Sequence, residues 1–350
     1  SLLYGSDAIG GVINFIKEKP APVGKILGDY QMQLHSNTLG MNNSIGLKGT
    51  SKNFFGGFRF GNKTHADYLQ GCGDYVPNSR FNEMTFKANA GYTGKIGTFK
   101  LFYDYFKQNL GMSVPDVKPL ITERGRKNEI WFQDLEHQLL SSQNSLYLGK
   151  FKWNINVAYQ NALRKLQTTL DVPFVEMNLN TITYESKLYL PSNDKSEYII
   201  GLQGMSQNNR NLNNRASQFL PNANINNMGF LGLAQYTFFK KLKLQGGLRF
   251  DLYKTETFAL GIEGTSSYHA PVNKEFSSLN GSIGTTYNVN KKLMFRSNFA
   301  KGYRVPNLSE LTSNGMHGNR YEIGNENLSP ENSFETDLSM HYHGEFLSFD

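Results

Sequence analysis

Apolar and polar residues alternate with a period of two through most of this chain, and this alternation limits what it can fold into. In residues 242–252 the even-numbered positions are apolar apart from one glycine, while the odd-numbered positions include Lys243, Arg249 and Asp251. The segments 99–105 and 334–343 repeat the pattern. An alternation of this kind indicates β-strands with one apolar and one polar face. The sequence therefore predicts an all-β fold.

Short and long links alternate between these strands along the chain. The short links fall at 52–53, 94–97, 149–152, 191–195, 240–241 and 288–292. The long links fall at 65–78, 109–135, 164–178, 208–222, 258–273 and 303–330. One hairpin thus recurs about every 45 residues. This order is typical of an antiparallel up-and-down sheet whose tight turns lie at one rim and whose long loops lie at the other.

Two architectures could use such strands, a soluble sandwich and a transmembrane barrel. Loops as long as 109–135 are unusual inside compact soluble domains. Strands of about ten residues, tilted by about 40°, cover the apolar band of a membrane barrel. No run approaches the ~20 apolar residues that a transmembrane helix needs. The pattern favours a transmembrane antiparallel up-and-down β-barrel.

The spacing predicts about fourteen strands, with a fifteenth starting at the last residues. A sheet left open in lipid would expose unpaired backbone groups on both edges, each costing several kcal/mol. We therefore expect the chain to be part of a longer protein that supplies the remaining strands.

Composition excludes several other classes of protein. The net charge is +7, but the basic residues are scattered, which argues against binding to nucleic acid. The single cysteine, Cys72, excludes a disulfide framework within the chain and fits a bystander in a glycine-flanked loop better than a catalytic thiol. No nucleophile elbow, H-E-x-x-H motif or paired-carboxylate motif is present. We therefore expect that the protein is not an enzyme and that it holds no cofactor and no metal.

Two segments depart from the alternation. The first, SLLYGSDAIGGVINFIKEKP at residues 1–20, combines Gly5, Gly10 and Gly11 with an apolar run at 12–16 that reads as a short strand after a turn. It lacks the Gly-Lys-Ser/Thr arrangement of a phosphate loop. The second segment, GYRVPNLSEL followed by IGNENLSPENS, occupies 302–333 and is rich in turn-forming residues. We expect 303–330 to be a loop, with Pro306 and Pro330 marking where strand pairing stops.

These two segments carry a family resemblance. The first resembles the end of the plug domain of TonB-dependent outer-membrane receptors, and the second resembles their paired F-R-A-P and N-P-N-L-x-P-E motifs, with Tyr303, Val305 and Glu326 as departures. The GLRFD stretch fits a barrel strand of the family, and NGMHGNRYEIGN is most similar to receptors of the Bacteroidetes type. The resemblance covers the whole chain.

The resemblance implies a fold, a location and a function. The fold is a barrel of roughly 22 strands closed by an N-terminal plug, with residues 1–20 as the plug end and 21–350 as an incomplete barrel. The protein lies in the outer membrane lipid and imports a nutrient with energy from the TonB-ExbB-ExbD complex. A ferric siderophore or haem is the favoured cargo, ahead of cobalamin or an oligosaccharide. A passive pore or surface adhesin without TonB coupling is the alternative, and an outer-membrane enzyme is a further rival.

The resemblance places the 303–330 loop over the ligand. His317 then resembles the axial ligand of haem receptors, and neutral imidazole suits haem iron. The alternative is a histidine that caps a turn or faces water. Three further residues of the expected binding site, Arg304, Arg320 and Tyr321, could contact an anionic ferric chelate. Trp131, beside Arg124, Arg126 and Lys127 in another long loop, could do likewise, with solvated loop charge as the alternative.

Polar residues on the strands are expected to face the barrel lumen. Arg249, Asp251, Arg296 and Asn298 are predicted to hold the plug through polar contacts. His341 and His343 lie on one face of a strand, where a wet lumen explains them better than a metal site.

Overall fold

The computed structural model describes residues 5, 12–71, 73–213, 218–317 and 320–349. Cys72 and the glycines Gly10 and Gly11 of the first motif lie outside this part of the chain. Within it, fourteen long strands and the start of a fifteenth form one antiparallel sheet, in which neighbours in sequence are neighbours in space apart from a hairpin inserted before the fourteenth. The predicted strand number is confirmed.

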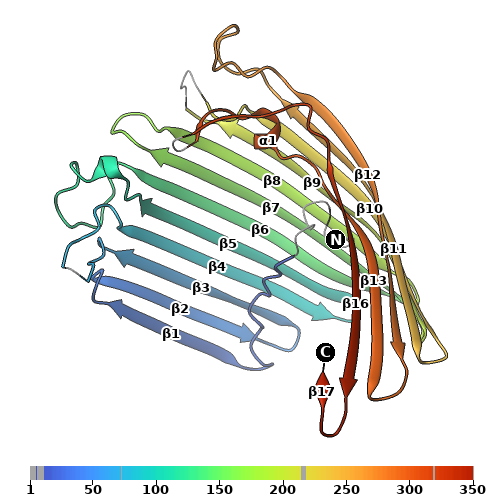
Figure 1. Cartoon of the computed structure of the whole chain (residues 1–350). Coiled ribbons are helices and arrows are strands. Elements are labelled where there is room, and N and C mark those ends of the chain that lie inside the picture. The colour runs from blue at the N-terminus through green and yellow to red at the C-terminus, as the bar shows by residue number, and fades with distance from the viewer. Residues whose placement is uncertain (1–4, 6–11, 72, 214–217, 318–319, 350) are drawn as a thin grey trace.

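The first half of the sheet follows the expected series of hairpins (Figure 1). Its strands are β1 (Ile26–His35), β2 (Gly40–Thr50), β3 (Phe54–His65), β4 (Phe81–Gly94), β5 (Gly97–Gly111), β6 (Phe132–Leu148) and β7 (Phe151–Gln167). Tight turns at 51–53, 95–96 and 149–150 alternate with longer loops, of which 66–80 and 112–131 are the largest here. The 112–131 loop contains a short 3-10 helix, η2 (Pro115–Val117).

The second half continues the same order. Its strands are β8 (Val175–Tyr189), β9 (Ser196–Asn211), β10 (Ala223–Phe238), β11 (Leu242–Thr257), β12 (Asn273–Asn288), β13 (Leu293–Arg304), β16 (Glu331–His343) and β17 (Ser348–Phe349). The 305–330 loop between β13 and β16 holds helix α1 (Leu308–Thr312) and a separate hairpin, β14 (Asn314–His317) with β15 (Arg320–Ile323). Strand β13 ends two residues before Pro306 and β16 starts directly after Pro330, as expected.

Some predicted lengths were wrong. The long strands contain 10 to 17 residues, rather than about ten. The expected loops 109–135 and 164–178 are shorter, since β5 and β6 pair as far as Gly111–Phe132, and β7 extends to Gln167. Seventeen residues span about 56 Å, so such strands project well beyond a ~25 Å apolar band. Two strands can stay paired beyond the lipid as long as each supplies hydrogen-bond partners to the other. The apolar pattern of the sequence does not show how far this pairing extends.

The two faces of the sheet differ as the alternation predicts. On β11, Leu248, Phe250 and Leu252 are 41–63% exposed, whereas Arg249 and Asp251 between them are at most 7% exposed. Such a row of exposed large apolar side chains suits a lipid-facing surface. The polar row faces the concave side. No helix in the described ranges is long and apolar enough to cross a membrane.

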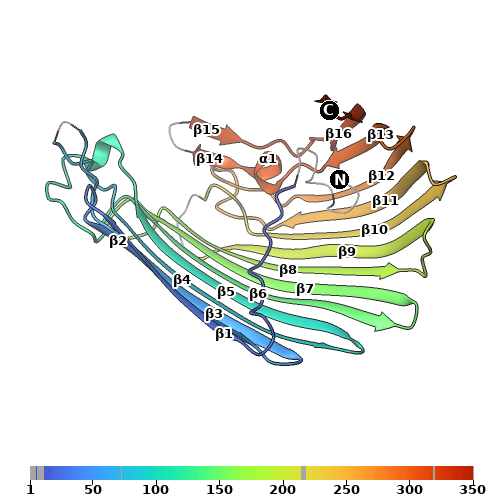
Figure 2. The same cartoon turned by 90° about the horizontal axis from the view of Figure 1, so that it is seen from below.

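The sheet curves into an open trough, with β1 and β17 as its edges (Figure 2). The N-terminal segment crosses the concave side, and α1 with the β14–β15 hairpin lies over the same side at the long-loop rim. Residues 12–16 form no strand, contrary to expectation, because this segment runs across the sheet rather than along an edge. The concave side therefore holds the N-terminal segment, α1 and the β14–β15 hairpin.

Candidate functional site

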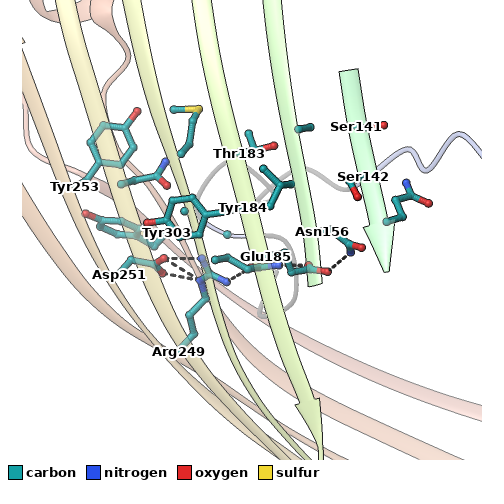
Figure 3. A pocket seen from close by; sticks show the side chains of 18 residues that line it. Ser141, Ser142, Asn156, Thr183, Tyr184, Glu185, Arg249, Asp251, Tyr253 and Tyr303 are labelled. Atoms are coloured by element: carbon teal, nitrogen blue, oxygen red, sulfur yellow. Dashed lines mark hydrogen bonds and ion pairs between the residues drawn. The ribbon is translucent and has the colours of Figure 1, made fainter. Parts of the chain in front are cut away.

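The concave face carries a buried ion pair at the centre of a cavity. Arg249 donates from Nε to both carboxylate oxygens of Asp251 at 2.8 and 2.9 Å, and both residues lie on β11 (Figure 3). Gly229 on β10 makes room for this pair, because a β-carbon there would come within 2.4 Å of Arg249 Nη2 and Asp251 Oδ1. The absence of a side chain at Gly229 therefore lets the Arg249–Asp251 pair lie over the neighbouring strand β10.

The pair continues into a polar network across the wall. Arg249 Nη1 donates to Gln203 Oε1, and Gln203 Nε2 donates to Glu185 Oε2, each at 2.5 Å. Glu185 also accepts from Lys187 Nζ at 2.5 Å and from Asn156 Nδ2 at 2.9 Å. The network crosses from β11 to β7 and holds two positive and two negative groups. Four of its members, Glu185, Gln203, Arg249 and Asp251, line a cavity of about 380 Å³ together with Asn156.

The N-terminal segment enters this cavity. Gly5 lines it, and a β-carbon on Gly5 would lie 3.4 Å from Arg249 Nη2. Gly5 has φ +91°, a conformation that side chains disfavour, so the close approach and the backbone both suit glycine. The structure thus brings Arg249 and Asp251 together beside this segment. Arg296 and Asn298 share the concave face on β13, but Asn298 donates to Asp337 at 3.3 Å and Arg296 is exposed.

Residues 17–19 bind the opposite wall of the trough. Lys17 forms an ion pair with Asp104 on β5. Glu18 pairs with Lys48 on β2 at 2.7 Å and with Arg59 on β3 at 3.6 Å. The hydrogen bond from Lys48 holds the pKa of Glu18 below its ordinary value. This end of the segment is therefore fixed to the wall by ion pairs with three strands.

The second motif builds the base of the 305–330 loop. Arg304 donates two hydrogen bonds to Glu310 at 2.9 and 3.0 Å, and two to Glu331 at 2.7 and 3.1 Å. Asn307 caps helix α1 and forms a reciprocal capping box with Glu310. The Arg304 hydrogen bonds hold the pKa of Glu310 below its ordinary value. Arg304 is thus engaged within the protein, where it holds α1 against the start of β16.

The β14–β15 hairpin presents the remaining expected binding residues. His317 is 68% exposed at its side chain, and its Nδ1 lies 2.9 Å from Glu322 Oε1. The ring of Phe219 packs beside the imidazole with centroids 5.3 Å apart. Arg320 pairs with His317 in the hairpin register and is exposed, while Tyr321 donates to Asn314 at 2.8 Å. Since Nδ1–H faces a carboxylate, the neutral ring keeps its Nε2 lone pair.

The 112–131 loop is occupied in holding itself to its neighbours. Arg124 donates to the carbonyls of Asp67 and Asn37 at 3.0 and 2.8 Å, and Arg126 donates to the carbonyl of Leu39. The carbonyl of Trp131 accepts from Asn78 Nδ2 at 2.7 Å. Among the described residues, no hydrogen bond or ion pair joins this loop to α1 or to the β14–β15 hairpin. The structure does not bring Trp131 to His317.

Sequence reasoning missed several partners of the named residues. Glu310 had a signal, because Asn307–Glu310 has the spacing of a capping box. Glu322 lies five residues from His317 and meets it only through the hairpin register. Gln203, Glu185 and Lys187 come from strands whose relative register is a tertiary property. Among the described residues no cluster of three or more metal-binding side chains occurs.

Comparison with known proteins agrees with this architecture. Residues 27–350 match the model of the family described as TonB dependent receptor-like, beta-barrel. The chain belongs to this family, whose barrels lie in the outer membrane. Among curated protein sequences, none matches it.

Solved structures of transport receptors share the fold. The ferric yersiniabactin uptake receptor FyuA from Yersinia pestis matches at 14% identity and TM-score 0.70, over 98% of this chain and 56% of that one. The Serratia marcescens hemophore receptor HasR, solved with its hemophore HasA and heme, matches at 13% identity and TM-score 0.69, over 93% of this chain and 52% of that one. The copper transporter OprC matches at 15% identity and TM-score 0.68, over 94% of this chain and 53% of that one. The chain spans about half the length of these proteins.

Proposed function

We propose that the protein containing this chain is an active importer that binds a ferric siderophore or haem at the long-loop rim. In this proposal residues 1–20 are the end of the plug, residues 21–350 are part of the barrel, and the TonB-ExbB-ExbD complex supplies the energy. The plug moves, and the ligand passes through the lumen to the periplasm. The barrel works as a transporter and carries out no chemical step of its own.

One observation carries the binding half of this proposal. His317 is exposed on a hairpin that lies over the concave face (Figure 2), and the Glu322 carboxylate at Nδ1 selects the tautomer in which Nε2 can ligate a metal. Haem iron takes a neutral imidazole in this form. Phe219 beside the ring supplies an apolar surface for a planar ligand. Arg320 supplies a positive charge toward haem propionates or an anionic chelate.

The test is a titration of the detergent-solubilised protein with haemin, followed by the Soret band. We expect a saturable shift in the wild type and its loss in His317→Ala. Glu322→Gln should weaken binding by about 10- to 100-fold, as expected for a group that orients a metal-binding histidine. His343→Gln is the matched control, since His343 lies on β16 at the far end from the loops.

Two outcomes would change the proposal. Equal haemin affinity in the wild type and His317→Ala would exclude ligation by His317. No saturable binding in either would move the search to ferric siderophores, with Arg320→Ala and Tyr321→Ala tested by quenching of intrinsic fluorescence.

The alternative function is a passive pore or adhesin without TonB coupling. The ion pairs of Lys17 and Glu18 with the wall favour the importer, because they attach a segment inside the lumen that a simple pore has no use for. Uptake by whole cells that persists after the proton-motive force is collapsed would support the passive alternative.

A further inference from the structure

A buried histidine joins three loops at the long-loop rim. His269 lies in the 258–272 loop and is 4% exposed. Its Nδ1 is 3.1 Å from the backbone oxygen of Thr312, at the end of α1 in the 305–330 loop. Its Nε2 is 2.7 Å from the backbone oxygen of Gln218 in the 212–222 loop. The imidazole therefore bridges the loops on either side of its own.

Both of these contacts require the ring to donate. A backbone carbonyl oxygen can only accept a hydrogen bond, and a neutral imidazole has a single N–H. Two hydrogen bonds to carbonyls therefore form only when the imidazole carries both protons. The neutral ring would instead direct a nitrogen lone pair at one buried carbonyl oxygen, which would lose its partner.

The backbone of His269 keeps the ring in place. Its amide donates to Leu260 O at 2.9 Å, and its carbonyl accepts from Leu260 N at 3.1 Å. This pair closes the 258–272 loop on itself. The backbone of His269 is therefore held within its own loop, whichever protons its ring carries.

The charged groups around the ring are few. On α1, Glu310 is bound to Arg304. The loop that carries His269 also contains Glu263 and Tyr268, and neither makes a described hydrogen bond to the ring through its side chain. The described residues of the 212–222 loop, 212–213 and 218–222, hold no titratable side chain. Within the described part of the chain, the ring's two hydrogen-bond partners are both neutral carbonyls.

The three loops joined in this way also position the hairpin. The backbone nitrogen of Asn314 donates to Phe219 O at 3.1 Å, and Asn314 Nδ2 donates to Ser266 O at 2.9 Å. Phe219 follows Gln218 directly and packs beside the ring of His317. A shift of the 212–222 loop away from His269 would therefore displace the apolar surface next to His317.

We propose that His269 is a proton-dependent clasp that assembles the ligand-binding rim, so that the three loops are held together when its imidazole is protonated and loosen when it is neutral. The part of the proposal that concerns ligand affinity rests on the proposed function. The part that concerns loop order does not.

The experiment is hydrogen exchange of the purified protein in detergent between about pH 5 and pH 8, the range in which histidines change charge. Rates are corrected with an unstructured peptide for the intrinsic effect of pH. We expect protection in peptides from 258–272 and 305–330 to fall about tenfold as pH rises, equivalent to one lost hydrogen bond. In His269→Gln, one amide group can donate to a carbonyl at every pH, so protection should be lower and independent of pH.

Haemin affinity gives the second arm of the test. At about pH 6 the His269→Gln variant should bind roughly tenfold more weakly than the wild type, and near pH 8 the difference should shrink. Because both proteins contain His317, its own titration cancels in this ratio. His343→Gln serves as the control and should retain the wild-type profile in both arms.

The outcomes separate the two proposals. Protection that is independent of pH in the wild type, or a profile unchanged in His269→Gln, would overturn the clasp. A pH-dependent clasp in a protein that binds no haemin would support this inference while the haem proposal fails. Circular dichroism checks that His269→Gln keeps its strand content. If strand content is lost, the comparison is repeated with His269→Asn.

Discussion

The 112–131 and 305–330 loops both combine arginine with an aromatic residue and turn formers, yet the structure holds them in opposite ways. In the 112–131 loop the arginines point back into the protein, where Arg124 and Arg126 bind backbone carbonyls of neighbouring loops. At the base of the 305–330 loop Arg304 is likewise engaged, with the carboxylates of Glu310 and Glu331. The hairpin of this loop leaves His317 and Arg320 exposed.

This difference shows that loop charge alone does not indicate a binding site. The 112–131 loop is anchored on a buried ion pair between Asp67 and Arg80, with side chains 1% and 7% exposed. Arg80 also donates to the carbonyls of Lys127 and Glu123 at 3.0 and 2.9 Å. Such a loop behaves as a fixed wall, whereas the hairpin presents the exposed side chains of His317 and Arg320 to a ligand.

The strongest test of this comparison is to remove the anchor of the fixed loop. Asp67→Asn leaves the buried Arg80 guanidinium without a counter-ion, and we expect the free energy of local opening of 112–131 to fall by about 3–5 kcal/mol. Hydrogen exchange of peptides from 66–80 and 112–131 measures it. Protection in 305–330 should stay unchanged, because no described contact joins the two loops. An equal loss in both loops would show that the rim is one cooperative unit.

A smaller effect is expected at the base of the hairpin loop. Arg304→Lys keeps the charge but loses the paired hydrogen bonds to Glu310 and Glu331, which should cost about 1 kcal/mol in local opening of 305–330. The pKa of Glu310 is lowered by Arg304, so its contribution to stability is present above the unfolded value of 4.5 and is lost as pH falls through the lower folded value. Protection of α1 should therefore decrease in acid in the wild type. A decrease of the same size in Arg304→Lys would contradict this assignment.

The smallest effect concerns the exposed pair in the fixed loop. Lys127 and Glu129 are 3.6 Å apart with side chains 86% and 63% exposed, and pairs of this kind contribute little. Lys127→Ala should leave protection of 112–131 within about 0.5 kcal/mol of the wild type. A larger loss would mean that the surface charge of this loop matters as much as its buried anchor.

Several features of the fold were predictable from local sequence. Alternation along β11 separates Leu248 and Phe250 from Arg249 and Asp251, since side chains on a strand point to opposite faces in turn. Pro306 and Pro330 mark the ends of β13 and β16, because proline donates no ladder hydrogen bond. The lengths of β6 and β7 were not predictable, since their outer ends are stabilised by pairing rather than by lipid.

The candidate site was only partly predictable for the same reason. His317 and Arg320 were found by motif and stand exposed on one hairpin. Arg304 stays a predicted ligand contact, and its hydrogen bonds to Glu310 and Glu331, the second of them 27 residues away, had not been predicted. His269 gave no signal, because the carbonyls of Gln218 and Thr312 are 51 and 43 residues distant from it.

The sequence by itself determined the strand number, the two faces of the sheet and the rim at which the long loops lie, because these follow from period-two alternation and turn chemistry within each hairpin. Only the tertiary structure decided which charged residues are free and which are engaged. That outcome depends on the register between strands and on the packing of loops against one another, and both bring together groups that lie far apart in the chain.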